Sequence, residues 1–272
     1  MTNATKVAPG QGSSVSKRQY RNPPVHEVIL DVQFTTGLDE KPLRELRDRL
    51  ARAFTKVEPL NVMQVQMTVG PGGQGFQTTA TQFGGWSFTD SPGDWVLQTS
   101  AMALTFHLVR PGPWPAGPYV GWSKIVERYL RVHDVLSDLY APLVPKRAGL
   151  RYLNRIAIPL GQDISAWLEF KLQAPKLLHD LFTFNLRQTW ARAGEHDDIS
   201  ATLGLAKIDV GDPAIATSNQ GVLLDIDIFN LWSEKAPPYE RLPDWFHRAH
   251  QVENDIFESC ITDALRERFE NP

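Results

Sequence analysis

The chain has 272 residues, of which 42% are hydrophobic and 22% are charged, and these fractions are typical of a globular protein. The formal net charge of -3 gives the molecule no overall positive field, so the composition disfavours a protein that binds nucleic acid over its whole surface. The single cysteine, Cys260, excludes an intramolecular disulfide and any Cys-rich metal site. We therefore expect no metal and no cofactor.

No stretch approaches the roughly 20 consecutive apolar residues that span a bilayer, and the N-terminal region has no apolar core typical of a secretory signal. We expect a cytoplasmic protein without membrane contact. Residues 1–21 are rich in Gly, Ser and Thr, and they include basic side chains but no acidic ones. This composition predicts a disordered basic tail, through which the protein could contact nucleic acid.

Residues 22–145 are predicted to form a first half. Apolar residues alternate with polar ones over 26–34, which is the period of a half-buried strand. Residues 38–54 have the spacing of an amphipathic helix with an arginine-rich outer face. From 62 to 110, several short β-rich runs separated by Gly, Pro and Asp predict an antiparallel meander, and residues 121–140 predict a helix that closes this half.

Residues 146–272 are predicted to repeat this order. A strand at 149–159 precedes a short helical region at about 164–180, three strands between 182 and 232, and one long helix at about 243–269. The sequence therefore predicts an α+β fold of two similar halves, each running strand, helix, antiparallel meander, helix, and packed as one unit. By analogy of element order, this is a TATA-binding-protein-like or helix-grip-like curved sheet covered by long helices.

Sequence motifs that suggest chemistry have simpler structural explanations. Gly70, Gly72 and Gly75 form a G-x-G-x-x-G pattern, but a predicted strand follows where a nucleotide site needs a helix, so a hairpin loop is favoured. His247, His250 and Glu253 recur every three residues and would spread around a helix, which favours a polar helix face over a metal site. Cys260 lies on a predicted buried stripe, and the sequence contains no motif typical of a nucleophile, so we expect no catalytic residues.

A polar cluster centres on the strand GLRYLNRIAIP. Alternation places Arg151 and Arg155 on one face of it and Tyr152 on the other. Asp225 and Asp227 share one face of another predicted strand. The arginines could form structural salt bridges with these carboxylates, or they could point into a cleft and bind an anionic ligand or a partner carboxylate bidentately.

Two further features belong to this cluster. Glu27 and Asp31 share a face of the first predicted strand and offer the arginines additional carboxylate partners. Asn154 falls on the apolar face beside Tyr152 and is predicted to be a hydrogen-bonded core amide.

Three stretches, PPVHEVILDVQF, AGLRYLNRI and HQVENDIFESCITDALRE, together resemble a sporadically distributed family of uncharacterised bacterial proteins. The matching positions are Pro24, Glu27, Phe34, Arg151, Tyr152, Asn154, Arg155, His250, Phe257, Thr262 and Asp263. The resemblance covers most of the chain after residue 21. It implies a bacterial, cytoplasmic protein and no particular activity.

The leading functional prediction is a non-catalytic binding or assembly protein that recognises another macromolecule, in a multi-gene bacterial system such as phage defence. A protein partner or a homo-oligomer is expected. The alternative is a small-anion-binding protein or enzyme with a cavity between sheet and helix. A weaker alternative is a nucleic-acid binder that uses the tail and the helix arginines Arg44, Arg47 and Arg52.

Overall fold

The computed structural model describes residues 20–70, 73–90, 94–110, 119–140, 143–170, 184–191, 198–209, 218–232 and 236–270, with the backbone alone for 62–82. The predicted tail up to residue 19 and most of the predicted helical region at 164–180 lie outside the described residues. The described chain forms one nine-stranded antiparallel sheet and four α-helices. The α+β class is therefore confirmed.

Strand β1 (Val25–Phe34) lies at the centre of the sheet. It pairs antiparallel with β5 (Ala103–Val109) on one side and with β6 (Pro145–Pro159) on the other. The predicted halves 22–145 and 146–272 therefore share one continuous sheet. The full order is β2-β3-β4-β5-β1-β6-β9-β8-β7. The remaining strands are β2 (Lys56–Gly70), β3 (Gly73–Thr89), β4 (Trp95–Ser100), β7 (Asn185–Trp190), β8 (Ser200–Ile208) and β9 (Asn219–Leu231).

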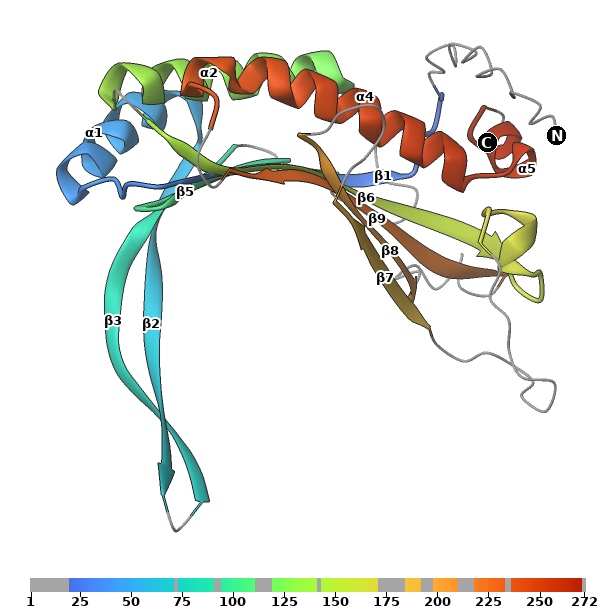
Figure 1. Cartoon of the computed structure of the whole chain (residues 1–272), viewed down its shortest axis with the longest axis horizontal. Helices are drawn as coiled ribbons and strands as arrows, with labels where there is room; N and C mark the ends of the chain where they lie inside the picture. Colours follow the sequence, from blue (N-terminus) through green and yellow to red (C-terminus); the bar gives the residue numbers. More distant parts are fainter. Residues whose placement is uncertain are drawn as a thin grey trace, which may run out of the picture.

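The described α-helices all lie on one face of the sheet, and the β2–β3 hairpin projects away from them (Figure 1). They are α1 (Glu40–Leu50), α2 (Trp122–Leu139), α4 (Leu242–Cys260) and α5 (Asp263–Glu270). Short 3-10 helices add η1 (Ala51–Ala53), η2 (Ile164–Ala166) and η3 (Tyr239–Arg241).

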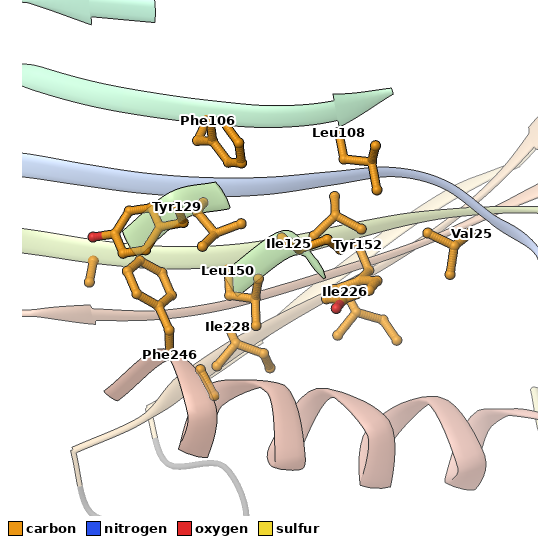
Figure 2. Packing of buried hydrophobic residues seen from close by; sticks show 14 of the residues in the cluster. Val25, Phe106, Leu108, Ile125, Tyr129, Leu150, Tyr152, Ile226, Ile228 and Phe246 are labelled. Carbon is orange, nitrogen blue, oxygen red and sulfur yellow. The ribbon is translucent and has the colours of Figure 1, made fainter. Parts of the chain in front are cut away.

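The hydrophobic core fills the layer between sheet and helices. Strand β1 contributes buried Val28, Leu30 and Val32, as its alternation predicts. Figure 2 shows Tyr129 of α2 beside Phe246 of α4, with ring centroids 5.1 Å apart. These aromatic contacts fix α2 and α4 against each other and against the sheet, and so position the inner faces of both helices.

The predicted break between two β-rich runs at Gly84 and Gly85 is wrong, because strand β3 spans it. Gly85 has a φ of 145°, and a Cβ there would lie 1.7 Å from the carbonyl oxygen of Thr99 on β4. The glycine therefore permits close strand approach and does not end the strand. At the other end of β3, Gly70 pairs with Gly73, which confirms the predicted hairpin.

The predicted single C-terminal helix is also wrong, because it divides into α4 and α5. Ile261 adopts an extended conformation and forms an isolated β-bridge with Leu168. Thr262 fixes the break, since its Oγ1 donates to the carbonyl oxygens of Ala166 and Trp167. Tertiary hydrogen bonds to a distant loop thus override a sequence pattern that is helical throughout.

Candidate ligand cavity

A cavity of about 480 Å³ lies at one end of the layer between sheet and helices. Its walls come from residues 20–25 before and at the start of β1, residues 119–123 leading into α2, Tyr152 and Asn154 of β6, and residues 250–258 of α4. Four segments that are distant in the sequence therefore converge on it. A concave site between sheet and helix is a common location for small-molecule binding.

Glu253 is the most unusual group in the cavity wall. Its side chain projects from the inner face of α4 and the residue is only 3% exposed. Within the described residues its carboxyl makes no hydrogen bond, and its closest basic atom is Nδ1 of His250, 3.8 Å from Oε2. Burial raises the pKa of Glu253 from 4.5 to about 8, because the ionised carboxylate loses its hydration. The carboxyl is therefore largely protonated at neutral pH.

His250 belongs to a hydrogen-bonded chain beside Glu253. The side-chain amide nitrogen of Asn254 donates to the carbonyl oxygen of His250 at 2.9 Å and lies 3.1 Å from Nε2 of its ring. An amide donor beside Nε2 favours the tautomer that carries the ring proton on Nδ1, 3.1 Å from the hydroxyl of Tyr152. In that tautomer the imidazole is neutral and donates to Tyr152. The Tyr152 hydroxyl in turn lies 3.5 Å from that of Tyr119.

Trp122, the first residue of α2, forms the opposite wall. Its ring stacks on His250 with centroids 4.3 Å apart and planes inclined at 21°. Its indole N–H donates to Nδ1 of His247 at 3.2 Å. These contacts tie the start of α2 to α4. Burial raises the pKa of both Tyr119 and Tyr152, so both phenols stay neutral and act as hydrogen-bonding groups.

The carboxyl, imidazole and phenol groups of this cavity wall can form hydrogen bonds with a bound molecule. The nearby thiol of Cys260 is buried, as the sequence predicts, and burial raises its pKa to about 11. Thiolate chemistry is therefore disfavoured. Across the described ranges, no three His, Cys, Asp or Glu side chains gather closely enough to hold a metal ion.

The structure separates the predicted polar cluster into two faces. Tyr152 points into the cavity, whereas Arg151 lies on the opposite face of the sheet. The Arg151 guanidinium binds both carboxylate oxygens of Asp225, at 2.7 and 2.6 Å. This bidentate pair favours the structural salt bridge over the anion site.

Arg147 contributes a second ion-pair group to the same face, because its guanidinium contacts Asp31 and, at 3.5 Å, Asp227. Burial raises the pKa of Asp227 while Arg147 opposes that shift. Arg155 has no ion pair within the described residues, and strand alternation places its side chain on the face of β6 opposite Tyr152. Asn154 is 1% exposed and its amide donates to the carbonyl oxygen of Leu224, so the predicted core amide is confirmed.

The predicted nucleic-acid arginines lie on and just after α1. Arg44 pairs with Glu40 on the preceding turn, and Arg47 pairs with Asp48. Arg52 lies exposed in η1. Neighbouring carboxylates thus neutralise much of this helix face, which favours a solvated surface.

Sequence reasoning missed the cavity residues of α4. It assigned His250 and Glu253 to a polar surface, and for Glu253 that was wrong because the residue is buried. One signal was available, since Glu253 lies about one helical turn from Ala249 and from Phe257, which are both apolar. The contribution of Trp122 and Tyr119 had no local signal, because it depends on how α2 packs beside α4.

No protein-family model and no curated protein matches this chain. The resemblance to a bacterial family therefore stays a prediction. None of the helices in the described part of the chain combines the length and hydropathy needed to cross a bilayer. The cytoplasmic location stays a prediction as well.

Proposed function

We propose that this protein binds a small molecule in the cavity between β6, α2 and α4. The observation that carries this proposal is Glu253, a buried carboxyl that lines a cavity and has no hydrogen-bond partner among the described residues. A ligand in the cavity can supply the hydrogen bonds that no described side chain makes to this carboxyl.

The surrounding groups support a binding role. Tyr152 and Tyr119 present hydroxyls, and Trp122 presents an aromatic surface, in the mixture of apolar area and a few polar groups typical of ligand pockets. The cavity replaces the anion site predicted around Arg151, whose guanidinium already pairs with Asp225. A strongly shifted acid in a concave site is a further mark of function.

Native mass spectrometry of protein gently purified from its own host tests this proposal. We expect a mass excess over the denatured chain that corresponds to a retained small molecule. Val120→Trp, in the cavity wall, should abolish the excess, and Val135→Trp is the control because Val135 is also half-buried but lies outside the cavity. If the excess is absent, or if Val120→Trp retains it, the proposal is wrong.

A second candidate is the predicted assembly role, favoured by the β2–β3 hairpin. Beyond Gly85, where pairing with β4 ends, β2 and β3 pair only with each other as far as Gly70 and Gly73. Residues 61–84 include no acidic, basic or histidine side chain. A long projecting hairpin without charge is typical of a surface that another protein covers.

The two-half architecture belongs to this second candidate. We propose that β1 and β6, adjacent at the sheet centre, begin two related halves in a TATA-binding-protein-like or helix-grip-like plan. In that plan the sheet face away from the helices is available to a partner macromolecule. On that face the positive charge of Arg151 is compensated by Asp225, which favours a protein partner over nucleic acid.

Light scattering coupled to size-exclusion chromatography tests the assembly role. Because Asn61 and Phe83 are register partners, residues 62–82 can be replaced by an Asn-Gly turn that preserves the strands below. An oligomer that becomes a monomer in the shortened variant supports the assembly role. Equal masses for both proteins would refute a role of the hairpin in self-association.

A further inference from the structure

We propose that the ligand of this cavity carries a protonated amine, and that Glu253 is its counter-ion. The inference rests on the proposed binding function and specifies the chemical class of the ligand. It follows from the charges in the cavity wall, from its aromatic and hydroxyl groups, and from the absence of a hydrogen bond to the carboxyl among the described residues.

The charges of the cavity wall favour a cation. Among the described lining residues the acids are Glu253, Asp255 and Glu258, and His250 is the one basic residue. Glu258 is already engaged by Arg266 at 2.9 Å and by the Tyr20 hydroxyl at 2.6 Å. Asp255 is exposed at the rim. The inner wall therefore offers one uncommitted carboxyl.

His250, whose Nδ1 lies 3.8 Å from the Glu253 carboxyl, has other groups closer to its ring nitrogens. The Asn254 amide lies 3.1 Å from Nε2 and the Tyr152 hydroxyl 3.1 Å from Nδ1, an arrangement that favours the neutral imidazole. Arg110, which interacts electrostatically with Tyr119, is not among the lining residues and donates to the carbonyl oxygens of Pro23 and Val25. Its position outside the cavity wall leaves the carboxyl of Glu253 open to a cation from solution.

The other lining groups suit an ammonium. Tyr119 and Tyr152 hold neutral hydroxyls whose oxygens accept hydrogen bonds, and an ammonium has three donors to satisfy. Trp122 adds an aromatic ring, the best partner for a cation among side chains. A ligand carboxylate or phosphate would meet an acid and no described basic lining group other than the neutral His250.

Binding of an ammonium has a measurable proton signature. Three titratable side chains face Glu253: Tyr152 from β6, Tyr119 from the segment before α2, and His250 from α4 itself. The raised pKa keeps both phenols neutral, and the contact with Asn254 favours a neutral His250. Glu253 is thus the group that changes charge. Its pKa of about 8 means that it holds a proton at neutral pH, and a cation beside it expels that proton.

Isothermal titration calorimetry with three probes of one skeleton tests the inference: phenethylamine, phenethyl alcohol and phenylacetate. The titrations use the full chain at about pH 7 in two buffers with different ionisation enthalpies, which counts the protons released. We expect the amine to bind about tenfold or more tightly than the alcohol. We also expect release of about one proton, falling towards zero at about pH 9 where Glu253 is already ionised.

Glu253→Gln is the decisive variant, because it keeps the shape and hydrogen-bonding capacity of the side chain but removes its charge. It should weaken the amine about tenfold, abolish proton release and leave the alcohol unchanged. Glu267→Gln, the same substitution at an exposed position on α5 outside the cavity wall, is the matched control and should leave all three titrations unchanged.

Two results would overturn the amine assignment while leaving the cavity function intact. One is an alcohol or carboxylate that binds as tightly as the amine. The other is an amine whose affinity is the same in Glu253→Gln. Failure of the amine to bind also overturns the assignment, and the retained-ligand measurement with Val120→Trp then decides the binding function separately.

Discussion

Replacement of Glu253 by glutamine should change how the stability of the protein depends on pH. The carboxyl has a pKa of about 8 in the folded state, against 4.5 for the ordinary side chain. Between these values the folded protein binds a proton that the unfolded chain does not, so wild-type stability falls as pH rises through this window. Below about 4.5 the penalty is absent, and above about 8 it is complete.

The magnitude follows from that span of pH. At about 1.4 kcal/mol per pH unit, the distance from 4.5 to about 8 corresponds to roughly 5 kcal/mol of lost stability. Glutamine is neutral throughout and does not incur this loss. Glu253→Gln should therefore match the wild type near pH 4.5 and exceed its stability by a few kcal/mol above about pH 8.

Urea denaturation at intervals between about pH 5 and about pH 9, followed by circular dichroism, measures this difference. Glu267→Gln, an exposed position on α5, is the control and should follow the wild type at every pH. If the stability difference between Glu253→Gln and the wild type is the same at all pH values, the carboxyl does not titrate as a buried group and the reasoning fails.

Three further predictions concern the fold. Gly85→Ala should cost more than about 3 kcal/mol because its Cβ would overlap the backbone of β4, whereas Gly161→Ala, with φ of 78° but open space, should cost only about 1 to 2 kcal/mol by thermal denaturation; equal losses would contradict the overlap. A double-mutant cycle on Arg151 and Asp225 should give a coupling free energy of about 1 kcal/mol, reduced by salt, and zero coupling would remove the salt bridge as a stabilising contact. Thr262→Ala should lose about 1 kcal/mol and raise hydrogen exchange where α4 meets α5, while unchanged exchange would mean that the side chain does not hold the break.

The local pattern of the sequence determined which segments become strands and helices and which faces they bury. The alternation in β1 and the stripe on α2 both depend on side-chain spacing, which is a local property. The interruption of the last helix at Ile261 was not predictable, because a distant loop supplies the competing hydrogen bonds. The same holds for Gly85, whose role depends on the neighbouring strand.

For the candidate site, too, part of the arrangement was predictable from the sequence and part depended on tertiary packing. The sequence placed Arg151 and Tyr152 on opposite faces of one strand, and strand geometry alone requires that separation. Whether Arg151 faced a ligand or a carboxylate depended on the register between β6 and β9, which brings Asp225 beside it. Only the packing of α2 beside α4 placed Trp122 near Glu253, because a cavity forms from the shapes of several elements and has no pattern in any one of them.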